Sequence, residues 1–413
     1  MRAHQCQNVP GVRKSLAGWA LLPCLAVLDF GQAGFVRRRQ VPFNKDTRML
    51  SARIKSAETA GELLDVVGRS VDEPVFNYIH AAAAYTRLGN LRKKGLLCAK
   101  EVDSDVLVRL GQRLQGMLLR REVGTLALAN IFWAAASLFT DMPAVLAIVP
   151  AVAERIPSRA RDMVPQHLSN NLWAAAQLKD AVPDALKCVP ALVEQIPLKA
   201  GDMTPQHLST SLWALKDFPD ALPTVAKAVQ ALVQEVEPQL GRMKPQELAN
   251  TVEALILLGE PVPIANQSGI VAAAATQLRC TLPGLKDKDL VLNAPMVIWA
   301  CRRFNVVDQR LFDAVVDRFS SHRLVASLPL WDLCALNLGS ELVCLSMIEA
   351  DEVDILTSCH TQFIKQPVKL RKWSYSTLNK PGKFGSFVDR LDSEIARRGL
   401  SGSENEVLAE RKT

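Results

Sequence analysis

Hydrogen-bonding side chains recur at intervals of forty residues in the middle of this chain. Amide, imidazole and hydroxyl groups donate and accept hydrogen bonds, so a row of them suits a ligand whose polar groups also repeat. The constant register is Gln166, Gln206 and Gln246; the two varying registers are His167, His207 and Glu247, and Asn171, Ser211 and Thr251. A constant residue cannot distinguish one ligand group from another. We therefore predict that the second varying register gives selectivity and that the glutamines hold the ligand's backbone.

The elements that must position these residues form an internal repeat between residues 121 and 260. Trp133, Trp173 and Trp213 lie forty residues apart, and Glu253 continues the series. Methionines and prolines keep the same step, at Met163, Met203 and Met243 and at Pro165, Pro205 and Pro245. A constant period of this length indicates stacked supersecondary units. Because each tryptophan ring buries a large apolar area and lies in an apolar run, we predict that these rings pack between units.

Each repeat is predicted to form two helices. Pro165 suits the first turn of the first helix, where its missing N–H has no helical partner. Pro183 is predicted to open the second helix, Pro190 to kink it and Pro197 to end it, whereas Gln230 replaces the central proline in the third copy. No such pair can bury its own apolar faces. We therefore predict an all-α fold, a right-handed α-solenoid of helix-pair repeats of about 40 residues.

Shifts in composition divide the chain into five segments. Residues 1–45 are predicted to be a presequence, and residues 46–120 an N-terminal helical region with a divergent repeat. The core repeats occupy residues 121–260. Degenerate repeats occupy residues 261–345, because the end units of a stack must close it against water. Residues 346–413 form a basic C-terminal extension whose tail is predicted to be disordered.

The N-terminal segment has the features of a targeting sequence. Arg13 and Lys14 precede an apolar run, Leu16–Leu28, that is too short to cross a bilayer. This is the plan of a secretory signal, and the basic, acid-poor stretch Phe35–Arg39 that follows resembles a transit peptide. We predict a plastid protein with a two-part presequence. A mitochondrial presequence, or a wrongly assigned start, is the alternative.

The charge distribution restricts where a polyanion could bind. Residues 121–260 contain 11 Lys and Arg against 15 Asp and Glu, a net charge of −4, although the whole chain carries +7. Candidate basic contacts within the repeats are Arg161, Arg242 and Lys244. Basic residues also flank the repeats at 87–100 and at 365–398. In the second of these flanks, Lys372 and Trp373 combine a cation with a ring that can stack on a base.

Two stretches of the repeat carry a resemblance to a known family. Thr204–Leu215 and Lys244–Thr251 resemble the core motif of octotricopeptide repeat proteins, although the period is slightly longer than usual and Glu253 replaces the tryptophan. The resemblance implies a helical-repeat protein of plastids or mitochondria. Such proteins bind single-stranded organellar RNA and act in the maturation, stability or translation of transcripts. In helical-repeat RNA readers, two or three side chains of each unit contact one base.

Other classes of function have less support in the sequence. It contains no GxxxxGK[ST], no HExxH and no GxSxG motif, so we predict no catalytic activity. Its nine cysteines form no CxxC pair, and Glu247 breaks the series of His167 and His207, so we predict no metal and no cofactor. An α-solenoid scaffold that binds other proteins is the alternative to RNA binding. In neither case do we expect the mature protein to enter a membrane.

Overall fold

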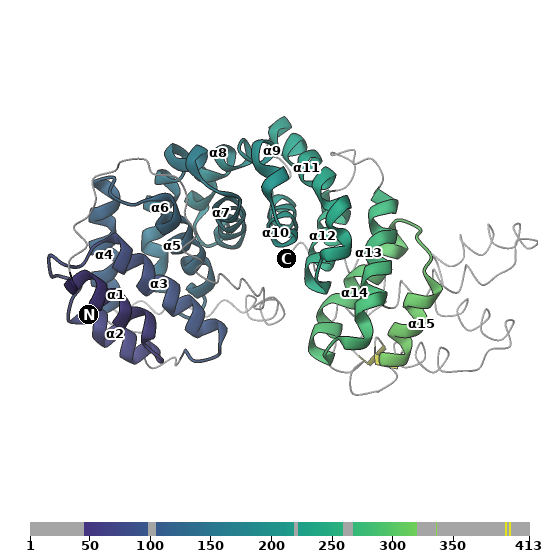
Figure 1. Ribbon diagram of the computed structural model, residues 1–413, viewed down its shortest axis with the longest axis horizontal. Helices are drawn as coiled ribbons and strands as arrows, with labels where there is room; N and C mark the ends of the chain where they lie inside the picture. Colours follow the sequence, from purple (N-terminus) through teal and green to yellow (C-terminus); the bar gives the residue numbers. More distant parts are fainter. Residues whose placement is uncertain are drawn as a thin grey trace, which may run out of the picture. The chain divides into compact units, whose positions relative to one another are not determined.

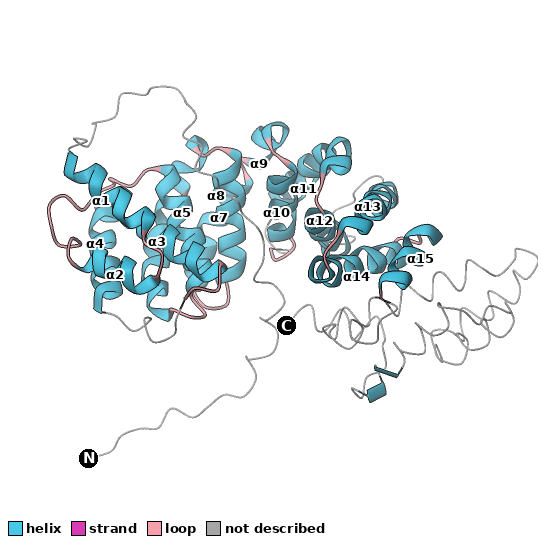
Figure 2. Ribbon diagram, turned by 60° about the horizontal axis from the view of Figure 1, so that its bottom comes forward, coloured by secondary structure: helices cyan, strands magenta, loops and turns pink. Residues whose placement is uncertain are grey.

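The computed structural model describes residues 45–97, 105–218, 222–258 and 267–319, together with residues 336, 393–394 and 396–397. In these residues all regular structure is helical and no strand occurs (Figure 2). The predicted all-α class is therefore confirmed. The described residues divide into an N-terminal unit, residues 45–236, and a C-terminal unit, residues 237–319. The division falls within the segment 121–260 that the sequence analysis assigned to core repeats.

The N-terminal unit consists of α-helices, labelled in Figure 1, with short 3₁₀ helices after α5, α6, α7 and α9. Its elements are α1 (Lys45–Ser56), α2 (Ala60–Gly68), α3 (Tyr78–Lys93), α4 (Asp105–Leu119), α5 (Thr125–Leu138), η2 (Pro143–Ile148), α6 (Val149–Arg155), η3 (Pro157–Asp162), α7 (Pro165–Leu178), η4 (Pro183–Cys188), α8 (Val189–Val193), α9 (Ile196–Lys199), η5 (Ala200–Asp202), α10 (Pro205–Leu215) and α11 (Leu222–Val236).

The helices α3, α5, α7 and α10 form a row in which each packs against the next in chain order. Side-chain pairs between the ends of neighbouring helices show that α3 and α5, and α7 and α10, run in the same direction. Arg92 near the end of α3 pairs with Asp141 just beyond α5. Lys179 just beyond α7 donates from Nζ to Oδ1 of Asp217 just beyond α10, at 2.9 Å. We call these four helices the first-helix row.

The segments between the members of this row form a second layer. In it α4 packs against η2, α6 against η4, and α11 against α8 and α9. Each connecting segment therefore lies beside the connecting segment of the next repeat. Apolar side chains of the second layer are buried, among them Leu110 and Leu114 of α4 and Leu192 of α8.

Prolines decide how the second layer is built. Pro150 and Pro190 occupy the first turns of α6 and α8, and a 3₁₀ helix precedes each of them. Because proline lacks an N–H and its ring clashes with the preceding turn, an α-helix can begin there but cannot run through. In the third copy Gln230 takes this place, and α11 is one continuous helix of 15 residues. Pro190 was predicted to kink the second helix; in the structure it lies where the 3₁₀ helix η4 ends and α8 begins.

Pro197 does not end the second helix, as the sequence analysis predicted. It is the second residue of α9, so it opens a further helical turn. The physical reason is the one that applies to Pro165: a first-turn residue has no helical partner for its N–H, so proline is tolerated there.

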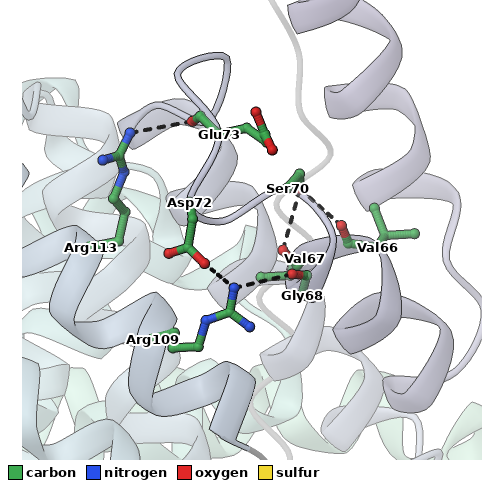
Figure 3. Close-up of polar contacts among 8 residues, drawn as sticks. All are labelled: Val66, Val67, Gly68, Ser70, Asp72, Glu73, Arg109 and Arg113. Atoms are coloured by element: carbon green, nitrogen blue, oxygen red, sulfur yellow. Dashed lines mark hydrogen bonds and ion pairs between the residues drawn. The ribbon is translucent and has the colours of Figure 1, made fainter.

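Side chains of the second layer donate hydrogen bonds to the backbone carbonyls that end the preceding segment. Figure 3 shows Arg109 and Arg113 of α4 directed at the turn before α3. Nη2 of Arg113 donates to the carbonyls of Glu73 and Phe76, both at 3.4 Å. Nη2 of Arg109 donates to the carbonyl of Gly68 at 3.4 Å. Carbonyls at the end of a helical turn lack intrahelical donors, and a cation there also satisfies the helix dipole.

The same interaction recurs before α7. Nζ of Lys199 donates to the carbonyl of Arg161 at 3.0 Å and also to the carbonyl of Met163. Arg161 and Met163 close the segment that leads into α7, just as Phe76 closes the one that leads into α3. We call this contact, from one second-layer segment to the end of the previous one, the carbonyl tie.

The C-terminal unit contains η6 (Glu237–Arg242), α12 (Pro245–Leu258), α13 (Gln267–Thr281), η7 (Leu282–Gly284), α14 (Asp287–Arg303) and α15 (Gln309–Arg318). Within it α12 and α14 pack against each other, and α13 packs against α12, α14 and α15. The carbonyl tie is present here too. Arg318 donates to the carbonyls of Leu282 and Leu285 at 2.8 Å each, and Nε2 of Gln277 donates to the carbonyl of Gly241 at 3.0 Å.

The contact between α3 and α5 depends on a glycine. A Cβ added to Gly89 would lie 2.9 Å from Cζ3 and 3.2 Å from Cη2 of Trp133. The tryptophan ring therefore occupies the space that a side chain at position 89 would need. Glycine inside a helix costs about 1 kcal/mol relative to alanine. This cost is offset by the close approach of the ring.

We expect Gly89→Ala to destabilise the protein by about 1–3 kcal/mol, because the rigid ring of Trp133 must move. Gly111 in α4 provides the matched control. A Cβ there would make ordinary contacts, 3.6 Å from Cγ2 of Ile148 and 3.8 Å from the hydroxyl of Tyr85. Gly111→Ala should therefore stabilise by up to about 1 kcal/mol. Thermal unfolding of both variants checks this, and a Gly89→Ala protein that melts at or above the wild-type temperature contradicts it.

Candidate nucleic-acid interface

Several candidate residues lie in the first turns of the helices, and some of them cap those helices. In α10, Nδ1 of His207 accepts a hydrogen bond from the backbone N–H of Thr204 at 3.3 Å. At the start of α12, Oε2 of Glu247 accepts a hydrogen bond from the backbone N–H of Lys244 at 2.8 Å. Both are the reciprocal half of a capping box, in which the third residue of a helix binds the N–H of the capping residue. The varying register of His207 and Glu247 is therefore a capping register.

The same arrangement begins α3. Nδ1 of His80 accepts from the backbone N–H of Asn77 at 3.1 Å, and Nε2 lies 3.0 Å from the carbonyl oxygen of Thr47. Because Nδ1 is the acceptor, Nε2 carries the proton and donates it to that carbonyl. His80 thus caps α3 and joins it to α1. Sequence reasoning did not include this residue, although Asn77 three positions before it is a typical capping residue.

His167 occupies the capping position of α7 but is enclosed. Its side chain is 8% exposed. Burial, and after it the positive charge of Lys199, lowers the pKa of His167 from 6.5 to about 4. The imidazole is therefore neutral near pH 7. A neutral, enclosed ring cannot neutralise a phosphate, so the candidate role of His167 in RNA binding is corrected to a packing role.

The register that the sequence analysis favoured for selectivity lies inside the protein. Asn171, Ser211 and Thr251 are each 0% exposed. Nδ2 of Asn171 donates to Sδ of Met163 at 3.2 Å, and Oγ1 of Thr251 donates to the carbonyl of its own helix at Glu247, at 2.8 Å. A side chain without exposed surface cannot contact a base in this conformation. The prediction that these three residues recognise the ligand is corrected accordingly.

The remaining candidates within the described residues are accessible. Gln166, Gln206 and Gln246 are half-buried on the first turns of α7, α10 and α12. Arg161, Arg242 and Lys244 are exposed just before those turns. Two candidates, Lys372 and Trp373, lie outside the residues that the structure describes. The accessible set therefore consists of side chains at the starts of the first helices, and none of it comes from their middles.

The repeated tryptophans contribute to packing. Trp213 is 8% exposed, and Nζ of Lys216 lies 4.2 Å from the centroid of its ring, a cation–π distance. Lys216 also pairs with Asp217 at 3.1 Å. Trp133 lies against Gly89, as described above, and Trp173 is half-buried. The predicted packing between units is confirmed at Trp133, which contacts the preceding helix of the row.

The charges of two arginines act on a third across the segments around α5. Arg155 ends α6, Arg159 lies in η3, and Arg121 follows α4 in a left-handed conformation with φ of 59°. Burial, and after it the positive charges of Arg121 and Arg159, lowers the pKa of Arg155, while Glu154 opposes this. The sequence analysis did not include Arg121, because a residue 34 positions before Arg155 acts on its charge only when the layers stack.

A comparison of this chain with protein-family models and with curated proteins finds no match. Among the described residues, no helix has both the length and the apolar character needed to span a bilayer. Nor do these residues contain a group of three or more His, Cys, Asp or Glu side chains that could hold a metal ion. The interpretation of the site therefore rests on its own geometry and charge.

The lowered pKa of His167 predicts a loss of stability in mild acid. The unfolded chain binds a proton near pH 6.5, whereas folded His167 binds one only near pH 4. The unfolded state thus holds more protons in this window, and the free energy of unfolding falls as the pH decreases from 6.5 toward 4. Between pH 6.5 and 5, where carboxylates titrate little, this one residue contributes a decrease of about 2 kcal/mol.

His167→Gln tests this assignment, because glutamine is a polar side chain of similar size and has no group that gains a proton in this pH range. We expect the variant to match the wild type near pH 7.5 and to lose less stability by pH 5 in urea unfolding experiments. Parallel pH profiles of the two proteins would show that His167 titrates normally.

Proposed function

We propose that this chain is a right-handed α-solenoid of helix-pair repeats of about 40 residues that binds single-stranded RNA. The observation that carries the proposal is the first-helix row. Because α3 and α5, and likewise α7 and α10, run in the same direction, their first turns lie along one edge of the N-terminal unit. That edge presents similar groups at intervals of one repeat, which suits a linear polymer with repeated phosphates and bases.

The groups on this edge favour an anionic polymer. The backbone N–H groups of a helix start carry a partial positive charge and bind phosphates. Two helix starts on the edge, at Gly124 before α5 and Val164 before α7, have no side-chain hydrogen bond to cap them. Half-buried Gln166 lies in the first turn of α7, and exposed Arg161 precedes that helix. Half-buried Gln206 lies in the first turn of α10. Arg242 and Lys244 provide equivalent groups before α12 in the C-terminal unit.

This arrangement concentrates basic groups although residues 121–260 have a net charge of −4. A negative average does not prevent phosphate binding, because salt screens charges that lie more than about 8–10 Å away. Local cations at the helix starts therefore decide the interaction. In the proposed function the chain holds transcripts during their maturation, stabilisation or translation and has no catalytic activity of its own. We propose a plastid as its compartment, with the mitochondrion as the alternative, on the basis of the presequence features.

We expect the full chain to bind a labelled oligouridylate of about twenty nucleotides, and we expect the affinity to fall steeply with salt. For single strands the logarithm of the association constant falls by about 0.7 per phosphate contact for each unit of log salt concentration. Fluorescence anisotropy titrations at several salt concentrations measure this slope. No binding at low salt, or a slope near zero, would argue against RNA as the ligand. Crosslinking in isolated organelles, followed by sequencing of the bound RNA, then identifies the natural transcript.

A scaffold for proteins is the second candidate, and exposed apolar side chains favour it. Leu119 is 83% exposed and Leu198 75% exposed, and Leu126 and Val164 are nearly half exposed. Apolar side chains on a surface are common partners in protein interfaces when they cluster. Affinity purification from organelles with and without nuclease separates the two candidates. Partners that persist after nuclease treatment, in the absence of crosslinked RNA, would favour the scaffold.

A further inference from the structure

Helix α1 adds one more parallel member before α3 in the row. Nε2 of His80, in the first turn of α3, donates to the carbonyl of Thr47 in the first turn of α1 at 3.0 Å. Nε of Arg87, further along α3, donates to the carbonyl of Ala57, just beyond the end of α1, at 2.7 Å. Because the starts are joined and the later parts are joined too, α1 and α3 run in the same direction. As the first described helix of the row, α1 packs against one row neighbour, α3.

One side of α1 is buried by this packing, and the other side is basic. Thr47, Leu50 and Ile54, at spacings of three and four residues, are buried. The exposed residues of the helix include all four of its cations and a single carboxylate, Asp46. We call the four cations the α1 basic face: Lys45, Arg48, Arg53 and Lys55.

The positive charge of the row is concentrated in its first two helices. Helices α1 and α3 together contain seven Lys and Arg against one Asp, a net charge of +6. The sequences of α5, α7 and α10 contain no Lys, Arg, Asp or Glu. Two cations of α3 are engaged in packing, since Arg87 donates to Ala57 and Arg92 pairs with Asp141. The exposed part of this charge is therefore the α1 basic face.

The stability of the helix does not account for these cations. Cations in the last turn, here Arg53 and Lys55, interact favourably with the helix dipole, whereas cations in the first turn do not. Lys45 and Arg48 lie in the first turn, where Asp46 carries the favoured sign. The solubility of an end repeat requires a polar outer face, which residues of both signs would also supply. An anionic partner would offset the repulsion within a face of one sign.

The length of the face suits an extended anion. Helix α1 has 12 residues and is about 18 Å long, at about 1.5 Å per residue. A small anion would contact one end of this face, whereas an RNA strand carries a phosphate on every nucleotide and can contact both ends. Because α1 is parallel to α3, its first turn lies at the edge that the first turns of the row form. A strand on that edge can therefore continue along α1.

A lipid surface fits the α1 basic face less well. Amphipathic helices bind lipid by burying large apolar side chains in it beside their cations. In α1 the side chains of Leu50 and Ile54 are already buried within the protein. Met49, which is 50% exposed, is the one large apolar side chain on the outer side of this helix.

We propose that the α1 basic face binds the phosphate backbone of single-stranded RNA and extends the interface from the first turns of the row onto the outer side of α1. Contacts to phosphates carry no information about the bases, so this face contributes affinity and not selectivity. The inference rests on the proposed function and specifies where that function obtains part of its affinity.

The test removes three of the four cations from the full-length chain. The variant Arg48→Gln, Arg53→Gln, Lys55→Gln keeps residues of similar helix propensity and removes their charge. Anisotropy titrations with labelled oligouridylate are made across a salt series. We expect the variant to bind roughly tenfold or more weakly near 0.1 M salt, with a log–log salt slope shallower by about 2, since each of three contacts contributes about 0.7.

Two further variants serve as controls. Lys227 on α11, Arg303 on α14 and Arg310 on α15 are exposed and lie outside the α1 basic face. Changing these three residues to Gln removes the same charge and should leave the salt slope unchanged. The variant Arg48→Lys, Arg53→Lys should bind like the wild type, because lysine also contacts phosphates as a point charge. All variants should keep the wild-type melting temperature.

The outcomes separate this inference from the proposed function. If the wild type binds RNA and the charge-removal variant keeps its affinity and slope, this inference is overturned and RNA binding stands. An equal loss in the control that lacks Lys227, Arg303 and Arg310 also overturns it, as an effect of net charge. If the wild type binds no RNA, the proposed function fails and this site fails with it.

Two additional measurements complete the test. If the charge-removal variant melts at a lower temperature, the single variants Arg48→Gln and Arg53→Gln decide, each with a slope expected to be shallower by about 0.7. Cosedimentation with phosphatidylserine vesicles covers the lipid alternative. Vesicle binding that the charge-removal variant loses, while its binding of oligouridylate is unchanged, would assign the face to lipid and overturn the inference.

Discussion

The packing of each first helix between two neighbours is the constraint on which the N-terminal unit depends. Helix α5 lies between α3 and α7, and α7 lies between α5 and α10. A helix that is covered on two sides by neighbours and on a third by the second layer retains little exposed surface. In α7 nearly every residue from His167 to Leu178 is buried, with Trp173 and Gln177 half-buried. Polar groups in the middle of such a helix depend on internal partners. Nδ2 of Asn171 finds one in Met163, whereas its buried Oδ1 has no hydrogen-bond partner.

This constraint moves any interface to the ends of the helices. The first turns remain accessible because each follows a segment that crosses from one layer to the other. Side chains in and just before the first turns have two roles. His80, His207 and Glu247 cap their helices, whereas the glutamines of the first turns and the arginines just before them face solvent. The capping register varies between histidine and glutamate because both offer an acceptor at the third position, and this variation says nothing about a ligand.

The sequence predicted the architecture of single repeats better than the site. The period of forty and the first-turn prolines located α7, α10 and α12 at their observed starts, and Pro190 located the interruption between η4 and α8. These features act locally, through the missing N–H of proline, and so they can be predicted from the sequence of a single repeat. The burial of Asn171 could not be predicted from the sequence, because a helix that is buried on most sides lacks the polar stripe from which exposure is inferred.

The effect of Arg121 on Arg155 escaped the sequence for a different reason: residues 34 positions apart act on each other only when the layers stack. The carbonyl tie has the same origin, since Arg113, Lys199 and Arg318 each bond to residues more than thirty positions earlier. Such contacts depend on which segments become neighbours in space. The sequence period predicts these neighbours only if the repeats are assumed to stack in chain order. Variation in the donor, which is arginine, lysine or glutamine, hides the pattern further.

The carbonyl tie has an evolutionary consequence. A repeat that carries the tie contributes a donor to the segment behind it, as Arg113, Lys199, Gln277 and Arg318 do. It offers acceptor carbonyls to the segment ahead, so both halves of the bond are encoded in one stretch of DNA. Neither a tandem duplication nor a deletion of one such repeat would leave a donor or an acceptor of this bond without its partner. Lineages could therefore lengthen or shorten such a row of helices without redesigning its junctions, and its length would change by whole repeats.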